Sequence, residues 1–316
     1  MMQYQVQQSD RHSKGRVGLL TTGHAEVETP AFMPVGSLGP VKGLEPEDLQ
    51  SLGFRLILNN AYHLYLRPGH KIVADMGGLH AFTGWPGAIL TDSGGFQIFS
   101  LAKLCEITDE GVTFQSHIDG STHFLTPEKA IEIEEALGAD IIMALDQCVA
   151  LVGEGKPDMY AMLDVTVPEL PESKPRYLMG VGHPEDLLEG VARGIDLFDC
   201  VVPSRHGRTG SLFTRTGRVV IKQARYAEDE RPIDPDCTCP VCRRYSRAYL
   251  HHLFIVKEML GARLNTIHNL WYFSELMRQI REALREGTFP EFRDAFYRNH
   301  PRQAVMAGLA ECEEPC

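Results

Sequence analysis

The sequence predicts an α/β protein built as a TIM-type β/α barrel. Short apolar runs alternate with amphipathic stretches, which is typical of parallel strands joined by helices. Polar and glycine residues follow the apolar runs at their carboxyl ends, where a β/α barrel places its active site. A doubly wound sheet would instead gather its ligand around one switch point. Because several separate strand ends carry polar residues, the pattern favours the barrel.

Six apolar runs are predicted to be buried parallel strands, because each is short and ends in polar or glycine residues. In chain order they cover residues 29–36, 55–60, 88–95, 140–147, 176–182 and 195–202. The stretch 125–139 is predicted to be a helix, with Thr126 as its cap and Pro127 at its first position. A second helix is predicted over 183–194, ending at Gly194.

The composition is that of an ordinary globular protein with an acidic excess. The chain has 316 residues and 31 Lys and Arg against 42 Asp and Glu, so its formal net charge is -11. That balance disfavours unselective binding of nucleic acid or membranes by the whole surface, but it leaves a local basic patch open. The first residues lack the apolar core of a signal peptide, and no apolar run approaches the length of a membrane span. We therefore expect a cytoplasmic protein with no membrane partner.

One local stretch has the opposite charge. Residues 203–226 contain six Arg and Lys and no acidic residue. Glycines and β-branched residues in this stretch predict hairpins or short strands rather than a helix. A solvated surface hairpin is the alternative, but so long an acid-free run in an acidic chain favours phosphate binding.

A cysteine cluster predicts a metal site. The motif CTCPVC, residues 237–242, places three thiolates in one turn-rich loop. In a cytosolic chain of this size, cysteines are more often reduced, metal-bound or catalytic than paired in disulfides. A fourth sulfur or nitrogen ligand would complete a structural zinc site. His268, expected near the start of a helix, is the preferred fourth ligand, and His251 and His252 are the competitors.

Three aspartates are expected to converge on the barrel mouth, since Asp92, Asp146 and Asp199 each end a predicted strand. Like charges at close range raise at least one pKa, which suits acid–base chemistry. A single aspartate of this kind is more often a helix cap or an ion-pair partner. Ser93 and two glycines follow Asp92, so a flat ligand could approach the backbone there, and Phe96 offers a ring for stacking.

Six motifs together resemble the bacterial tRNA-guanine transglycosylases. They are TDSGGFQ, KPRYLMGVG, GVARGIDLFDCVVPSR, IKQARYAED, CTCPVCRRYSRAYLHHLF and TIHNLWYF. The resemblance runs from about Arg16 through the cysteine region and beyond, in order and with characteristic spacing. Members of that family exchange guanine at the wobble position of tRNAs with a GUN anticodon for the 7-deazaguanine base preQ1. The resemblance therefore implies tRNA, guanine and preQ1 as partners.

The resemblance also implies roles for the residues singled out above. Asp199 matches the nucleophile that attacks the ribose C1′ and holds the tRNA covalently. Asp92 matches the general base that deprotonates the incoming base. Phe96 and Met179 match the pair that sandwiches the base. The implied base-binding set is Ser93, Gly94, Gly95, Phe96, Asp146, Met179 and Gly180.

Two further residue sets follow from the same resemblance. The anticodon and its neighbours would be held by Gly180, Val181, Gly182, His183, Pro184, Glu185, Asp186, Ser204, Arg205, His206, Gly207 and Arg208. One structural Zn²⁺ per chain would be held by Cys237, Cys239, Cys242 and His268. The family is commonly a homodimer, so a homodimer is expected.

The resemblance breaks down after Asp146. Only about thirty residues separate this strand end from the strand that begins near Arg176. The family places three helix–strand steps in that interval, so we predict a barrel that lacks one or two βα units. The missing part includes the glutamine of the family's Gln-Gly-Gly stretch, which helps to bind the base. Residues 149–152, VALV, are a candidate replacement strand; an open barrel or a covering partner subunit are the alternatives.

The predicted organisation has three parts. Residues 1–202 form the barrel body with the active site, residues 203–270 the basic hairpin and zinc-binding subdomain, and residues 271–316 the C-terminal helices and tail. The leading functional hypothesis is a tRNA-guanine transglycosylase. The second hypothesis is a weakened or non-catalytic tRNA-binding homologue, because part of the base pocket is missing. The third is an unrelated phosphate-handling barrel enzyme with a zinc knuckle.

Overall fold

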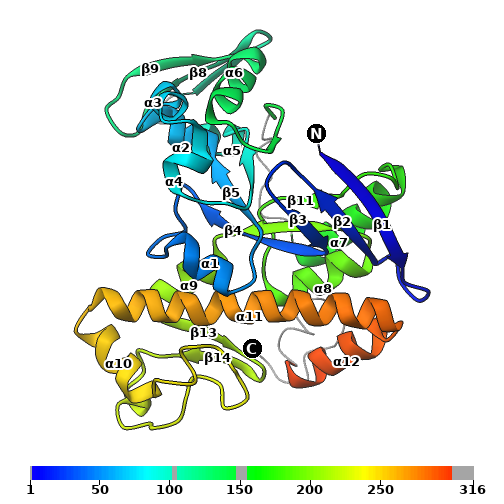
Figure 1. Cartoon of the computed structure of the whole chain (residues 1–316), viewed down its shortest axis with the longest axis vertical. Helices are drawn as coiled ribbons and strands as arrows, with labels where there is room; N and C mark the ends of the chain where they lie inside the picture. The colour runs from blue at the N-terminus through cyan, green and yellow to red at the C-terminus, as the bar shows by residue number, and fades with distance from the viewer. Residues whose placement is uncertain (1, 102–104, 147–154, 301–316) are drawn as a thin grey trace.

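A sheet of six parallel strands forms the centre of the molecule (Figure 1). The computed structural model describes residues 2–101, 105–146 and 155–300. The strands lie in the order β10-β6-β5-β4-β12-β11, and the sheet is curled like part of a barrel. This confirms all six predicted strands. Their bounds are β4 (Ala31–Gly36), β5 (Leu56–Asn60), β6 (Ala88–Asp92), β10 (Ile141–Ile142), β11 (Tyr177–Leu178) and β12 (Leu197–Cys200).

Side chains on the two faces of the sheet belong to different apolar clusters. Leu56 and Leu58 of β5 lie in a cluster with Leu20 and Val27 of the N-terminal strands, whereas Ile57 lies in the larger cluster that includes the surrounding helices. The same alternation is repeated in β4, β6 and β12. Parallel strands that are buried on both faces carry continuous apolar runs, which is why these strands are readable from the sequence.

Two small antiparallel sheets flank the barrel sheet. The first contains β1 (Gln3–Ser9), β2 (Arg16–Thr21) and β3 (Glu26–Thr29), and its turn between β2 and β3 lies near the amino ends of β6 and β10. The second contains β7 (Cys105–Thr108), β8 (Gly111–Gln115) and β9 (Thr122–Leu125). The second sheet and its neighbouring helices form the lobe at the top of Figure 1.

The helices between the strands cover the outside of the sheet. Both predicted helices are confirmed, with Thr126 accepting a hydrogen bond from the Lys129 amide as the cap of α6. Their bounds, with those of the other connecting helices, are α1 (Pro46–Ser51), α2 (Ala61–Leu66), α3 (His70–Asp75), α4 (Gly78–Thr83), α5 (Gly95–Leu101), α6 (Pro127–Leu137), α7 (Lys156–Thr166) and α8 (Pro184–Ala192). Two short 3-10 turns cover Val167–Glu169 and Ala224–Tyr226.

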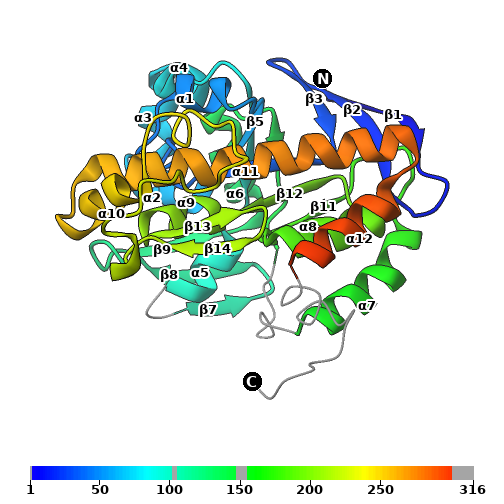
Figure 2. The same ribbon diagram turned by 90° about the horizontal axis from the view of Figure 1, so that it is seen from below.

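The longest helix, α11 (Met259–Glu286), links the barrel to the cysteine-rich region (Figures 1 and 2). It contacts β4 and α8 of the barrel, and it also contacts α9 and β13. The region around its first half contains β13 (Ser211–Thr214), β14 (Gly217–Val220) and α10 (Arg247–Ile255), and α12 (Phe289–Asn299) follows its end. The predicted domain boundary at residue 270 falls within α11.

The expectation of strands rather than a helix over residues 203–226 is half wrong. β13 and β14 form the expected hairpin, but the residues before them form helix α9 (Val202–Arg208). Pro203 stands at a first-turn position of α9, where its missing N–H costs nothing. Gly207 lies against the backbone of Thr266 in α11, so packing on the long helix determines this conformation.

Within the described residues, the barrel sheet is open between β10 and β11. Each of these strands pairs with one neighbour among the described residues, β10 with β6 and β11 with β12. A closed barrel of this type has eight strands, so the described sheet corresponds to six of them. This agrees with the predicted loss of βα units after Asp146. The candidate replacement strand, residues 149–152, lies outside the described residues.

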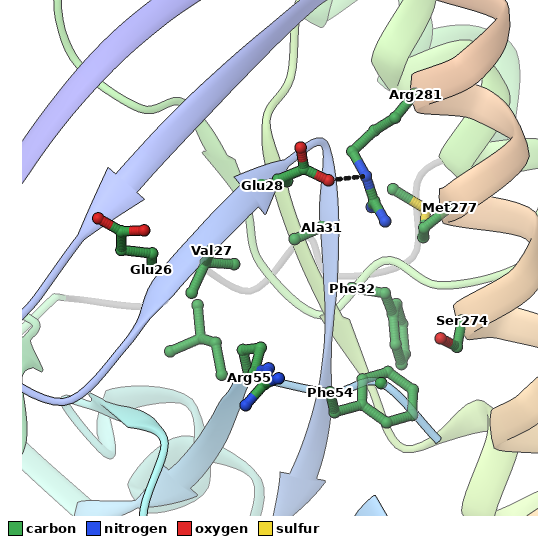
Figure 3. A pocket seen from close by; sticks show the side chains of 12 residues that line it. Glu26, Val27, Glu28, Ala31, Phe32, Phe54, Arg55, Ser274, Met277 and Arg281 are labelled. Atoms are coloured by element: carbon green, nitrogen blue, oxygen red, sulfur yellow. Dashed lines mark ion pairs between the residues drawn. The ribbon is translucent and has the colours of Figure 1, made fainter. Parts of the chain in front are cut away.

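A pocket of about 280 Å³ opens at the amino ends of the strands (Figure 3). It is lined by residues of β3, β4 and α11, with the carboxylate of Glu28 lying 3.6 Å from the guanidinium of Arg281. Because barrel enzymes bind substrates at the carboxyl ends, this pocket is not the candidate active site. No helix in the described part of the chain is long and apolar enough to cross a membrane.

Candidate active site and metal site

Asp92 is the buried carboxylate at the end of β6. Its side chain accepts hydrogen bonds from the Asn60 amide group at 2.5 Å and from the Ala61 backbone N–H at 3.2 Å. Burial raises the pKa of Asp92 to about 8, and the charge of Asp199 contributes in the same direction. At neutral pH the carboxyl group is therefore mostly protonated, although it needs little change in pH to ionise.

Asp199 is the second buried carboxylate, at the third position of β12. Its Oδ1 atom accepts hydrogen bonds from the Tyr177 hydroxyl and the Gly180 backbone N–H, both at 2.7 Å. Burial raises the pKa of Asp199, and these two hydrogen bonds partly offset that effect. Both donors bind the same oxygen, and within the described residues Oδ2 accepts no hydrogen bond from the protein. Oδ2 is thus the oxygen that remains free to react.

Asp146 differs from the other two aspartates because it is exposed. It follows β10, and its Oδ1 atom accepts a hydrogen bond of 2.5 Å from the Ser93 hydroxyl. Gly95 packs so closely on Asp146 that an added Cβ would lie 2.4 Å from its backbone oxygen. At Gly94, which has a φ of +78°, a Cβ would lie 2.6 Å from that of Tyr62. These glycines are therefore required where the protein packs on itself at the strand end.

Phe96 and Met179 are both large exposed apolar side chains, at 44% and 42% exposure. Phe96 is the second residue of α5, which begins shortly after β6, and Met179 follows β11 directly. Exposed side chains of this size suit stacking on a flat ring. Their joint contact with a base remains a prediction.

The loop after β11 combines open backbone with buried acids. Gly180 has a φ of +71° and is exposed, and Gly182 lies so close to Cys200 that a Cβ there would clash at 2.3 Å. Glu185 and Asp186, which the resemblance assigns to RNA, are buried, and both pair with Lys156 at 2.7 and 2.8 Å. In this conformation their side chains support α8, and a role in RNA binding remains a prediction.

The other residues that the resemblance assigns to RNA binding also include both exposed and buried members. His183 and His206 lie edge to face with their ring centres 6.1 Å apart, and His206 stacks on Phe213. Burial lowers the pKa of His206 to about 4, with the charge of Arg218 as the next cause. Among the remaining residues of this set, Arg205 is exposed and Val181 and Arg208 are half-buried. The buried ones are Pro184, Ser204 and Gly207.

The four predicted metal ligands come together. The Nδ1 atom of His268 lies 3.9, 3.5 and 3.4 Å from the sulfurs of Cys237, Cys239 and Cys242. His268 is confirmed as the fourth member, while His251 instead contacts the Ile221 backbone oxygen. The expectation that His268 lies near a helix start is wrong, because α11 begins at Met259.

A neighbouring contact orients the histidine for metal binding. The Nε2 atom of His268 lies 2.7 Å from the backbone oxygen of Phe213, so Nε2 carries the proton and Nδ1 keeps its lone pair. His268 is 1% exposed, and Cys239 and Cys242 are buried. A buried set of three sulfurs and one nitrogen makes a closed, structural metal site.

Comparison with known proteins identifies the family. The sequence profile described as queuine tRNA-ribosyltransferase matches residues 10–152 and 150–302. The chain belongs to the queuine tRNA-ribosyltransferase family.

Relatives that carry this name match nearly end to end. The queuine tRNA-ribosyltransferase of Caldanaerobacter subterraneus subsp. tengcongensis is 45% identical and covers 95% of this chain and 98% of the relative. That of Desulforamulus reducens is 46% identical over 92% and 96%, and that of Symbiobacterium thermophilum is 47% identical over 93% and 90%.

The queuine tRNA-ribosyltransferase comparison also locates the shortening. The two matched segments of the profile meet at residues 150–152, between β10 and β11 in the chain. The alignment with the Caldanaerobacter relative extends over 366 residues although this chain has 316, so it contains gaps in this chain. Sequence and sheet therefore agree on where the family's barrel is interrupted here.

Two residues of the site were not found by sequence reasoning. Asn60 ends β5 and holds Asp92, and Tyr177 lies in β11 and holds Asp199. Asn60 lies at the carboxyl end of a predicted strand, so the rule that selected the aspartates could have selected it, whereas Tyr177 is the first residue of β11 and that rule does not reach it. Their partners depend on how neighbouring strands align, which the sequence does not state.

Proposed function

We propose that the chain is a tRNA-guanine transglycosylase that exchanges the wobble guanine of GUN-anticodon tRNAs for preQ1. Membership of the queuine tRNA-ribosyltransferase family is the main observation that supports this proposal. The buried pair of Asp92 and Asp199 at the carboxyl ends of β6 and β12 supports it, because this pair supplies one acid–base group and one nucleophile.

Asp199 is proposed as the nucleophile. Its free Oδ2 attacks the ribose C1′, and the bond from C1′ to N9 of guanine breaks, leaving a covalent bond between the tRNA and the enzyme. Tyr177 and Gly180 fix the carboxylate through Oδ1, so that Oδ2 faces the sugar. Attack by N9 of preQ1 on C1′ then releases Asp199 as a carboxylate.

Asp92 is proposed as the group that moves the proton. With a pKa raised to about 8 by burial, it enters the reaction mostly protonated and gives its proton to the departing guanine. The resulting carboxylate accepts the N9 proton of preQ1, which regenerates the starting state. The protons therefore balance over one exchange without any further group.

Base and RNA contacts extend from this pair. Asp146, presented by Ser93, accepts donors from one edge of the purine, and Phe96 and Met179 cover its faces. The exposed Arg205 meets the anticodon backbone, since basic side chains supply phosphate binding. A splayed single-stranded base is the kind of RNA target that such a site accepts.

We propose that the structural metal is Zn²⁺. A tetrahedral site with Zn–S bonds near 2.3 Å and Zn–N bonds near 2.05 Å places sulfur and nitrogen about 3.6 Å apart. The three distances from His268 Nδ1, 3.4 to 3.9 Å, fit this value. The ion joins the cysteine loop to α11, and it takes no part in the exchange. A homodimer that acts in the cytoplasm is proposed on the family resemblance.

Incorporation of radiolabelled guanine into a GUN-anticodon tRNA tests the function. The parent protein is expected to incorporate label, and Asp199→Asn to lose at least about 10³-fold of the rate while still binding tRNA. Asp75→Asn is the matched control, because Asp75 is an exposed aspartate at the end of α3.

A second readout separates the outcomes of that test. The parent is expected to form a tRNA adduct that survives a denaturing gel, and Asp199→Asn to form none. If a folded, metal-loaded parent binds tRNA but neither incorporates label nor forms an adduct, the non-catalytic homologue is the correct function. Exchange that persists in Asp199→Asn would reject the assignment of the nucleophile.

A further inference from the structure

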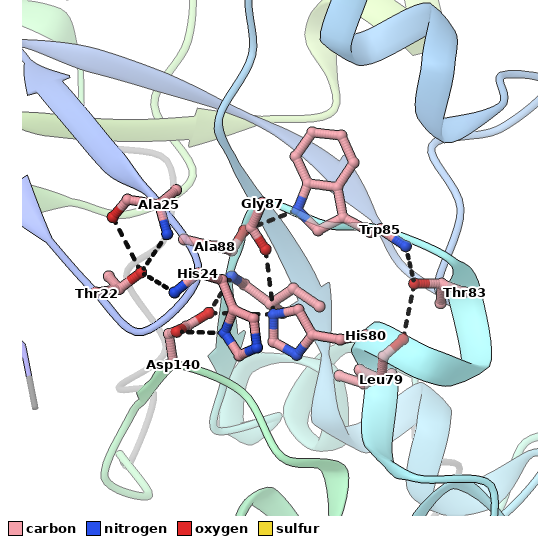
Figure 4. A network of polar contacts seen from close by, with 11 residues as sticks. Thr22, His24, Ala25, Leu79, His80, Thr83, Trp85, Gly87, Ala88 and Asp140 are labelled. Atoms are coloured by element: carbon pink, nitrogen blue, oxygen red, sulfur yellow. Dashed lines mark hydrogen bonds and ion pairs between the residues drawn. The ribbon is translucent and has the colours of Figure 1, made fainter.

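Two histidines and an aspartate gather at the amino ends of the strands (Figure 4), whereas Asp92 and Asp199 lie toward the carboxyl ends of β6 and β12. His24 lies in the turn between β2 and β3, His80 in α4, and Asp140 directly before β10. One possible ligand atom from each lies within 4.8 Å of those of the other two. The proposed exchange reaction uses none of the three.

Both imidazoles contact the same carboxylate, each through one nitrogen. The Nδ1 atom of His24 lies 2.8 Å from Oδ1 of Asp140, and Nε2 of His80 lies 3.2 Å from Oδ2. The backbone oxygen of Gly87 lies 3.1 Å from the same Nε2. An ion that replaced the two imidazole protons would therefore meet only nitrogen and oxygen lone pairs.

Asp140 is fixed before any ion binds. It accepts a hydrogen bond from the Ile89 N–H at 3.0 Å and donates its own N–H to the Ile89 oxygen at 3.0 Å. These two backbone contacts hold the Asp140 carboxylate directly before β10.

The two imidazole rings stack with centres 3.6 Å apart and planes 17° from parallel. Because the lone pair of each nitrogen lies in the plane of its ring, one ring has to turn before both nitrogens face the same ion. The turn that carries His24 is held by the Thr22 hydroxyl, which accepts hydrogen bonds from the N–H groups of His24 and Ala25. A surface hollow beside His24 gives an ion access, since the His24 side chain is 45% exposed.

We propose that His24, His80 and Asp140 form a second metal site for a divalent transition ion such as Zn²⁺ or Ni²⁺. Two imidazoles with one carboxylate are typical ligands of these ions and are disfavoured by Mg²⁺ or Ca²⁺. Bonds near 2.05 Å in a tetrahedral site place ligand atoms about 3.3 Å apart, which is close to the two nitrogen–oxygen distances of 2.8 and 3.2 Å.

The ion has a structural consequence in this chain. It joins the β2–β3 turn, α4 and the residue before β10, which is an edge strand of the open sheet. Since binding to the folded state alone stabilises it, the ion raises the free energy of unfolding. Three protein ligands leave a coordination position open to water, so this site exchanges its ion more readily than the cysteine site.

Separate assays of zinc and nickel test the proposal. Untagged protein that has retained its cysteine-bound zinc is equilibrated with Ni²⁺, gel-filtered and analysed for both metals. The parent and the exposed-histidine control His12→Ala are expected to hold one zinc and one nickel per chain. His24→Ala and Asp140→Asn are expected to hold one zinc and to bind nickel at least tenfold more weakly in titration calorimetry.

The retained zinc shows that each variant is folded, so a loss of nickel is specific to the second site. A parent that binds no nickel overturns the proposal. Nickel binding that is unchanged in both His24→Ala and Asp140→Asn overturns it as well. A melting temperature raised by nickel in the parent and His12→Ala, but not in His24→Ala, supports the stabilising role.

Discussion

The two carboxylates proposed to be catalytic occupy similar places but are held differently. Asp92 accepts one donor on each oxygen, whereas Asp199 accepts both donors on Oδ1. A carboxyl group that transfers protons works best when it is held in position and its pKa lies near neutral pH. A nucleophilic carboxylate needs one oxygen free of hydrogen bonds. The hydrogen-bond pattern therefore separates the two roles.

The raised pKa of Asp92 predicts how the exchange depends on pH. Because burial raises this pKa to about 8, the carboxylate that accepts the proton of preQ1 is scarce below pH 8. Release of the covalent intermediate by preQ1 is expected to accelerate about tenfold per pH unit up to about pH 8 and then to level off. Rapid-quench measurements from pH 5.5 to 9 provide the check. A flat profile in the parent would reject Asp92 as the base, and a slow, flat one is expected for Asp92→Asn.

The same shift has a consequence for stability. A carboxyl group whose folded pKa lies above its unfolded value binds its proton more tightly in the folded state. Its contribution to the free energy of unfolding is therefore greatest below the unfolded pKa, near 3.8, and falls as pH rises to about 8.

Tyr177 is expected to act by positioning Asp199. Tyr177→Phe removes one of the two hydrogen bonds to Oδ1, which raises the pKa of Asp199 and slows adduct formation by about 10- to 100-fold. The pH at which adduct formation reaches half its maximum is expected to move upward, a change that a purely structural role would not cause. Tyr249→Phe, an exposed tyrosine on α10, is the control. Unchanged rate and pH profile in Tyr177→Phe would contradict this role.

Secondary structure was predictable wherever the pattern of one segment determined it. The six parallel strands and α6 follow from continuous apolar runs and from a Thr-Pro start. Helix α9 did not follow, since a short basic segment with a proline and a glycine has little helical preference of its own and depends on α11. Asn60 and Tyr177 were missed for a related reason, because strand pairing selects their partners.

The contact between α9 and α11 predicts a stability effect. Gly207→Ala places a Cβ 2.8 Å from the Thr266 backbone, so the helices must separate slightly, and the free energy of unfolding is expected to fall by about 1–3 kcal/mol. Urea denaturation measures the change. In Gly23→Ala the nearest atom lies at an ordinary 3.6 Å, and no comparable loss is expected. Equal stability of the two variants would show that α9 does not depend on close packing.

At the scale of the whole molecule, α11 connects two apolar cores. Its residues contribute to the barrel core through Phe273 and Ile280 and to the core of the cysteine region through Leu264. His268 lies between these groups on the same helix. Metal binding is therefore coupled to the place where the cysteine region joins the barrel.

Loss of the structural metal is expected to weaken this junction. His268→Ala removes a ligand and leaves the three thiolates without closure, so the melting temperature should drop and zinc content should fall below one per chain. The cost is expected to be at least about 2 kcal/mol. Circular dichroism melts with metal analysis measure both. His252→Ala, an exposed neighbour on α10, should retain zinc and stability; zinc retention in His268→Ala would contradict the ligand set.

The opening between β10 and β11 allows a chimera to be built by inserting a segment of a relative at this position. Both edge strands pair in parallel with their inner neighbours, β10 with β6 and β11 with β12. The interruption is therefore confined to the place between these two edge strands. The corresponding βα units of the Caldanaerobacter relative, grafted between Asp146 and Gly155, would meet two existing strand edges and leave the catalytic pair in place. Such a graft would show what the family's missing strands add to base selection, against a background in which everything else is unchanged.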